Sequence, residues 1–274
     1  MLRDTIIRLS RFVPQFLRSR LAASSYGNLA RRALNRVNHD PQPVADLCGP
    51  LAGQRMRVNW ASHKTYVFGT HEPHIMQIIR DVVRPGWTAV DVGANIGYST
   101  LLLARCVGPA GRVLAFEPLA ENFRMLQENI RLNDHRNVTA ENLALMERTG
   151  RIELRTATPG AMTWAASATI DAAKAVETQD VEAVTLDEYA IRNGIAKIDF
   201  LKMDVEGAEA DVLAGMGSIL DRQKPLLLIE IHQSDLFGEN HPALCKLREH
   251  NYQISDLGTR GWERHVLANA AMQS

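Results

Sequence analysis

Four polar residues that follow two strongly apolar runs have side chains suited to moving protons or binding a metal ion. Asp204 and Glu206 come directly after the run Phe200–Met203. Glu230 and His232 stand two positions apart at the end of a second apolar run, so a strand would point both to the same side. Polar groups at the end of a buried strand are costly unless they are used. We therefore predict that these four residues form a catalytic group.

Two kinds of chemistry are open to this group. The first is general base catalysis, and His232 is the best candidate because the ordinary pKa of an imidazole lies near neutrality. Asp204, Glu206 and Glu230 are the alternative bases. The second is a divalent cation that the acids would hold and that would lower the pKa of a substrate hydroxyl. The cation is the alternative that we do not expect, so the predicted site contains no metal ligand.

A glycine-containing turn after the run Ala89–Val92 is the strongest binding signal in the chain. From Asp91 the sequence reads DVGANIGYS, so an acid ends a strand and a turn opens a helix. Gly93 and Gly97 let a ligand approach the backbone, and the start of the helix offers free N–H groups. The turn lacks the G-x-G-x-x-G pattern that holds a pyrophosphate. An acid beside the turn suits a ligand with an ammonium group and no phosphate, such as S-adenosylmethionine.

Two later strand ends extend this predicted cofactor site. Glu117, followed by Pro118, ends the next apolar run, where nucleotide-binding folds place the acceptor for the ribose hydroxyls. Asn122 follows on the next predicted helix. Asn142 and Ala144 come at the end of a third run, where an amide and an apolar shelf could hold the edge and the face of an adenine.

Four blocks of the sequence, taken together, resemble the FkbM family of S-adenosylmethionine-dependent methyltransferases. The blocks read VDVGANIGYST, FEPLAENF, LKMDVEGAEADVLAGM and LLIEIH, in the order typical of the family, and the resemblance runs from about Gly69 to about His232. It implies a Rossmann-like methyltransferase fold and transfer of a methyl group to oxygen, often on sugars, glycans or secondary metabolites. The cofactor-binding residues that we predict are Glu72, Asp91, Gly93, Asn95, Gly97, Ser99, Glu117, Pro118, Asn122, Asn142 and Ala144.

Short apolar runs alternate with helical patterns over most of the chain, which indicates an α/β fold. We expect a mostly parallel central sheet with helices on both faces and an N-terminal helical extension. A short hairpin is predicted over Arg57–Val67. Strands are predicted over Thr88–Val92, Arg112–Phe116, Val138–Leu143, Arg151–Thr156, Phe200–Met203, Leu226–Ile231, Tyr252–Leu257 and Trp262–Ala268. Helices are predicted over Pro73–Val83, Gly97–Val107, Ala120–Leu132, Leu186–Asn193, Ala208–Met216 and His241–Asn251.

The chain divides into a basic helical extension with a linker, residues 1–53, and a Rossmann-like methyltransferase domain, residues 54–274. Residues 1–36 combine apolar residues at helical spacing with eight arginines and one acid, Asp4. Such a segment could be a cap helix on the domain, a helix that touches an anionic membrane, or a transit peptide. No apolar run reaches the roughly 18 residues of a membrane span. We expect a cytoplasmic protein, with peripheral membrane contact through residues 1–36 as an option.

Composition narrows the class of partner. The chain has 274 residues, 46% of them apolar and 23% charged, and its formal net charge is zero. A soluble domain with a sizeable core is expected, with no overall charge to attract nucleic acid. Cys48, Cys106 and Cys245 lie far apart and have no metal or disulfide spacing. We expect a small-molecule or glycan acceptor. Two other functions stay open, a nicotinamide-dependent oxidoreductase and a non-catalytic nucleotide-binding or scaffold protein on the same fold.

Overall fold

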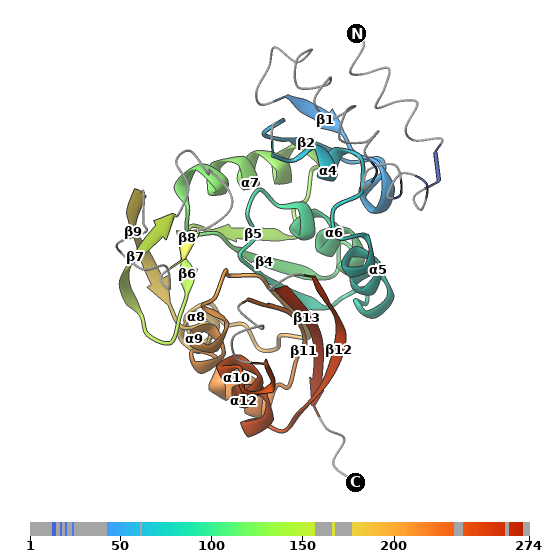
Figure 1. Ribbon diagram of the computed structural model, residues 1–274. Coiled ribbons are helices and arrows are strands. Elements are labelled where there is room, and N and C mark those ends of the chain that lie inside the picture. The colour runs from blue at the N-terminus through green and yellow to red at the C-terminus, as the bar shows by residue number, and fades with distance from the viewer. Residues whose placement is uncertain are drawn as a thin grey trace.

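A twisted seven-stranded sheet forms the centre of the protein (Figure 1). The computed structural model describes residues 13, 14, 17, 20, 24, 43–60, 62–156, 166–167, 177–232, 238–260 and 263–270. The helices predicted within residues 1–36 lie outside the described residues, apart from those five isolated positions. The strand order is β12 (Tyr252–Arg260), β13 (Glu263–Ala270), β11 (Leu226–Ile231), β10 (Phe200–Met203), β3 (Thr88–Val92), β4 (Arg112–Phe116) and β5 (Val138–Glu141).

The order of the strands reverses between β3 and β10, and this fixes where a ligand can bind. From β3 the chain continues to β4 and β5 on one side, and it returns to place β10 and β11 on the other side. These five strands are parallel, whereas β13 runs antiparallel between β11 and β12. A crevice outside the carboxyl ends of the strands is expected at such a reversal. The predicted mostly parallel sheet is confirmed.

Helices cover both faces of the sheet because successive strand residues alternate between two apolar cores. Ala89 and Val113 belong to the core on one face, and Val90 and Leu114 belong to the core on the other. The first core includes α5 (Pro73–Val82), α6 (Tyr98–Val107) and part of α7 (Ala120–Leu132). The second includes α8 (Leu186–Arg192), α9 (Glu209–Ala214), α10 (Gly217–Arg222) and α12 (Pro242–Glu249). The short η3 (Gly238–Asn240) precedes α12.

A second, four-stranded sheet beside the main one was missing from the sequence prediction (Figure 1). It contains β6 (Ala144–Leu145), β9 (Glu177–Val184), β7 (Gly150–Thr156) and β8 (Ala166–Ser167), in that order. Only β7 was expected. The sequence ETQDVEAV of β9 is mostly polar and was not recognised as a strand. Its pairing with β7, which spans seven residue pairs, is a long-range contact that local sequence does not indicate.

Two predictions for residues 44–67 were wrong. The linker assigned up to residue 53 is part of the domain, because Leu47, Cys48 and Leu51 are fully buried in the core beside α5 and α6. The ribbon of β1 (Val44–Asp46) and β2 (Arg55–Arg57) flanks η1 (Gly49–Leu51). The hairpin predicted after residue 57 is replaced by α4 (Lys64–Val67). The prolines and glycines in this segment are typical of a linker. They concealed the true start of the domain, although the apolar residues between them are buried.

Asn129 on α7 joins the β1–β2 ribbon to the glycine turn. Its amide oxygen accepts from the Arg57 backbone N–H at 2.6 Å, and its amide nitrogen donates to the carbonyls of Arg57 (3.1 Å) and Ile96 (2.7 Å). The side chain is fully buried. Asn129→Ala would leave these groups without partners, so we expect the free energy of unfolding to fall by about 2–4 kcal/mol. Asn193, which is exposed and donates only to Tyr189 among its recorded bonds, provides the control Asn193→Ala. Equal urea midpoints for the two variants would contradict this role.

Among the helices that the structure describes, none has the length and apolar content needed to cross a bilayer.

Candidate active site

A cavity of about 610 Å³ opens at the carboxyl ends of the parallel strands. Its size is typical of small-molecule sites, which fall at roughly 300–1,000 Å³. Its walls come from the ends of β3, β4 and β10 with the turns that follow them, from Glu230 in β11, from the second sheet, and from the segment between Ser62 and Glu72. Tyr66 and Tyr98, whose rings stack with centroids 4.5 Å apart, form one side. The predicted binding and catalytic residues therefore meet at the reversal point of the sheet.

The glycine turn after β3 is pressed against the turn after β10. Gly93 has a φ of +77°, and a Cβ at this position would lie 1.9 Å from the carbonyl oxygen of Asp204. Asn95 also adopts a left-handed backbone (φ 51°), which asparagine tolerates better than most residues. Gly93, Asn95 and Ser99 line the cavity. Gly97 does not line it, because its bare Cα faces Leu126 on α7, where a Cβ would lie 2.8 Å from a side-chain carbon.

Glu117 at the end of β4 is held by the turns on either side of it. One carboxylate oxygen accepts from the Asn95 backbone N–H at 2.8 Å, and the other accepts from the Leu119 N–H at 2.9 Å and the Asn122 amide at 3.4 Å. Burial raises the pKa of Glu117 to about 7, although these hydrogen bonds favour the ionised form. Glu117, Pro118 and Asn122 all line the cavity. A rigid carboxylate in such a wall can accept two vicinal hydroxyls.

We expect Glu117→Ala to weaken binding of S-adenosylhomocysteine by at least about tenfold, or 1.4 kcal/mol. The reason is the loss of both the acceptor oxygens and the brace between two turns. Glu121→Ala is the matched control, because Glu121 is exposed in the first turn of the next helix. Calorimetric titration measures both affinities. Equal affinity in the two folded variants would remove Glu117 from the cofactor site.

Besides Gly97, two more predicted cofactor residues do not line the cavity. Asp91 is completely buried, and one of its oxygens accepts from the Thr100 hydroxyl at 2.6 Å. Its other oxygen has no hydrogen-bond partner among the described residues. Burial raises the pKa of Asp91, while nearby Lys202 opposes the shift. Asn142 donates to the backbone carbonyls of Glu117 (2.9 Å) and Pro118 (2.8 Å), whereas Ala144 does line the cavity. Asp91 and Asn142 thus support the binding turns from behind.

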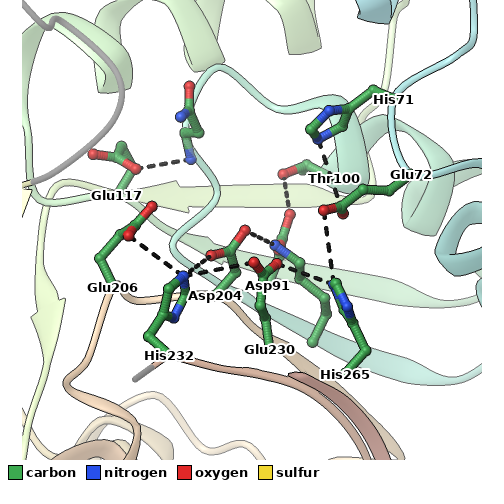
Figure 2. A network of polar contacts seen from close by, with 12 residues as sticks. His71, Glu72, Asp91, Thr100, Glu117, Asp204, Glu206, Glu230, His232 and His265 are labelled. Atoms are coloured by element: carbon green, nitrogen blue, oxygen red, sulfur yellow. Dashed lines mark hydrogen bonds and ion pairs between the residues drawn. The ribbon is translucent and has the colours of Figure 1, made fainter. Parts of the chain in front are cut away.

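Three carboxylates gather at the other end of the cavity, as the sequence predicted. Asp204, Glu206 and Glu230 line the cavity, and His232 stands behind them with 4% of its surface exposed. Its Nε2 lies 3.4 Å from Glu206, 3.6 Å from Glu230 and 3.9 Å from Asp204 (Figure 2). Glu206 and Gly207 both have positive φ, which makes the turn after β10 sharp. Glu72, with its own left-handed backbone at the start of α5, lines the cavity nearby.

The electrostatics of this cluster change the role predicted for His232. Burial alone would lower the pKa of His232, but the hydrogen bond to Glu209 and the surrounding carboxylates raise it to about 9. Burial raises the pKa of Glu206 to about 7, against the influence of His232. Without a bound cation, the imidazole is therefore largely protonated at neutral pH, and it lies behind the cavity wall. The carboxylates, which line the cavity, are better placed to take a proton from a substrate than His232.

Three residues of the cluster were missed or misjudged in the sequence. Lys202, buried within β10, donates to Asp204 at 3.1 Å, and although burial opposes its charge the surrounding acids raise its pKa. Glu209 was interpreted as a first-turn acid of a helix, yet its fully buried carboxylate also contacts His232 Nδ1 at 2.7 Å. His265 on β13 lies opposite Glu230 in the strand register, and their side chains are 3.1 Å apart. Of these three residues, only Lys202 could have been recognised from the sequence, because a lysine inside an apolar strand is unusual.

The residues that line the cavity suit the chemical groups of S-adenosylmethionine. Glu117 would accept hydrogen bonds from the ribose, and the apolar segment Leu143–Leu145 would pack against the adenine. Aromatic faces and carboxylates in the wall would attract the positively charged sulfonium. The buried amide oxygen of Asn122 has no hydrogen-bond partner among the described residues, so it could accept one from a ligand. The missing Cβ at Gly93 keeps the two turns in contact around this space.

Several known proteins have a similar sequence or a similar structure. 2-O-methyltransferase NoeI of Sinorhizobium fredii is 27% identical over 205 residues, which cover 70% of this chain and 82% of NoeI. Methyltransferase 1 of Beauveria bassiana is 31% identical over 143 residues, or 46% of this chain and 57% of that relative. The structure of PH0793 from Pyrococcus horikoshii superimposes with a TM-score of 0.50 at 15% identity, over 85% of this chain and 72% of that one.

The family is decided by the sequence model of the FkbM methyltransferase domain. This model matches residues 91–254, more than half of the chain, and the matched span begins at the glycine turn and includes Glu117, the acids after β10 and His232. The sheet has the Rossmann-like arrangement that such a domain requires. The chain belongs to the FkbM methyltransferase family.

Proposed function

We propose that the protein is an S-adenosylmethionine-dependent O-methyltransferase whose acceptor is a hydroxyl of a small molecule, a sugar or a glycan. The observation that carries this proposal is that one cavity joins the glycine turn and Glu117 to three lining carboxylates. The glycine turn and Glu117 suit the cofactor, and the three carboxylates suit an acceptor that must lose a proton. The similarity to NoeI, a 2-O-methyltransferase, supports the choice of oxygen.

The protein's own part in the reaction is alignment and proton transfer. S-adenosylmethionine, when bound, supplies a methyl group that is already activated by the sulfonium. The rigid wall around Glu117 and Asn95 would hold the donor in one orientation, and alignment of this kind can lower a barrier by several kcal/mol. Asp204, Glu206 or Glu230 would accept the hydroxyl proton as the oxygen becomes methylated. Glu206, with its pKa near 7, can both take and release a proton at neutral pH.

A methyl-transfer screen with labelled donor tests the proposal. Sugars, glycolipid precursors and phenols would be offered as acceptors, and the position of the label would be read by mass spectrometry and NMR. An O-methyl product supports the proposal, whereas label found only on nitrogen or carbon contradicts it. Thermal shift distinguishes the cofactor class, because S-adenosylhomocysteine should raise the Tm and NAD(H) should not. The opposite pattern would favour an oxidoreductase.

A further inference from the structure

Three side chains at the ends of β10 and β11 each aim one ligand atom at a common point. The atoms are Asp204 Oδ1, Glu230 Oε1 and His232 Nε2, and all three lie within 4.8 Å of one another (Figure 2). From His232 Nε2, the two oxygens are 3.9 and 3.6 Å away. These separations are too long for hydrogen bonds. Ligands about 2.1 Å from an ion lie roughly 3.0–3.5 Å apart, so a small contraction would bring these three atoms onto one cation.

Each of the three side chains is anchored through its other polar atom. Asp204 Oδ2 accepts from Lys202 at 3.1 Å, Glu230 Oε2 contacts His265 at 3.1 Å, and His232 Nδ1 contacts Glu209 at 2.7 Å. A histidine that binds a metal usually donates its other N–H to a carboxylate, and this partner fixes the ring. Glu209, which is completely buried, holds His232 in that way. The three inward atoms are thus preset while the outward atoms are already bonded.

Charge in this region also favours a cation. Carboxyl groups outnumber groups that can carry positive charge, six to four, within the described part of the cluster. Most of these groups are shielded from water, so the imbalance is weakly screened. The carboxyl groups are Glu72, Asp91, Asp204, Glu206, Glu209 and Glu230, and the others are His71, Lys202, His232 and His265.

We propose that Asp204, Glu230 and His232 bind a divalent cation of the Mg²⁺ or Mn²⁺ class at the floor of the cavity. A mixed set of carboxylate and imidazole ligands suits Mn²⁺ well. Asp204 and Glu230 line the cavity, so the open face of the ion points toward the acceptor. The proposal rests on the proposed function in one respect: the ion would bind the acceptor hydroxyl and lower its pKa, so that a neighbouring carboxylate takes the proton. The interpretation of the sequence had ranked this arrangement second.

A second triad, Glu72, Glu230 and His265, could in principle hold the ion instead. The hydrogen bonding argues against it. His265 uses Nε2, the nitrogen that faces the acids, to contact Glu230 at 3.1 Å. The same nitrogen lies 3.7 Å from Glu72. In the proposed triad, His232 Nε2 lies 3.6 and 3.9 Å from the two ligand oxygens, with Glu206 at 3.4 Å, so it is less closely engaged than His265 Nε2. Its other nitrogen already contacts Glu209. His265 is therefore a positioning residue for Glu230.

Electron paramagnetic resonance of Mn²⁺ tests the site without any methyl transfer. Titrating the full chain should remove the signal of free Mn²⁺ with one ion bound per chain, and excess Mg²⁺ should restore it. Asp204→Asn and His232→Gln should each weaken Mn²⁺ binding by at least about tenfold. Asp221→Asn and His250→Gln are matched controls, because these two residues form a similar pair, 2.7 Å apart, away from the cavity. Melting curves would check that every variant is folded.

The possible outcomes distinguish the two triads. They also distinguish failure of the proposed metal site from failure of the proposed function. Loss of Mn²⁺ binding in Glu72→Gln, with Asp204→Asn unaffected, would place the ion on the second triad and overturn the proposal. Absence of saturable binding up to millimolar Mn²⁺ would overturn it as well. Full methyl transfer in EDTA would contradict the catalytic part while leaving the O-methyltransferase proposal intact. Failure of every hydroxyl acceptor would contradict the proposed function alone, because Mn²⁺ binding is measured directly.

Discussion

Gly93→Ala should abolish measurable binding of S-adenosylhomocysteine while leaving most of the sheet folded. The new Cβ would lie 1.9 Å from the Asp204 carbonyl oxygen, a backbone atom that cannot move aside without shifting the turn after β10. The positive φ adds roughly 1–2 kcal/mol of strain. Together these effects should separate the two turns that enclose the cavity. We expect affinity to fall by at least about hundredfold, or 2.7 kcal/mol, in calorimetric titration.

Gly108→Ala controls for the backbone strain. Gly108 ends α6 with a φ of +65°, and a Cβ there would meet nothing within 4 Å. This variant should lose about 1 kcal/mol of stability and keep its cofactor affinity. If Gly93→Ala behaves in the same way, the contact between the two turns does not shape the cofactor site.

His232→Gln should lower kcat by about 10² to 10⁴ and change the affinity for S-adenosylhomocysteine less than threefold. The imidazole lies within 4 Å of Asp204, Glu206 and Glu230, so its loss disturbs all three of these carboxylates at once. Glutamine retains an N–H that can reach Glu209, so this buried carboxylate keeps a side-chain donor in addition to the Gly207 backbone N–H. The predicted loss holds whether His232 carries a proton or binds the proposed ion.

Steady-state kinetics on an acceptor from the screen would measure this effect, with His250→Gln as the comparison. The His250 side chain lies 2.7 Å from that of Asp221, which is on α10, and His250 does not line the cavity. A rise in KM with kcat unchanged would indicate an acceptor contact instead of a role in the chemical step. An unchanged kcat would remove His232 from the machinery.

The sequence alone determined the main sheet, because its strands are short apolar runs whose pattern is local. Thr88–Val92, Arg112–Phe116, Phe200–Met203 and Leu226–Ile231 were predicted at the bounds that the structure has. The carboxyl ends of parallel strands meet at one edge, so Gly93, Glu117 and Asp204 could be assigned to one site from their places in these runs. These inferences required only the period of the side chains and the direction of the strands.

Tertiary structure decided which polar groups face the cavity and which stand behind it. Asp91 and His232 occupy strand ends like their neighbours, yet both are screened by other residues, because solvent access depends on what packs over a strand end. His265 entered the cluster through the antiparallel strand β13, whose register with β11 is set by long-range pairing. The protonation of His232 likewise depends on three carboxylates, those of Glu209, Asp204 and Glu206, which come from α9 and the turn after β10. The distances to these charges and the burial of the imidazole, which together set its pKa, are defined only in the folded chain.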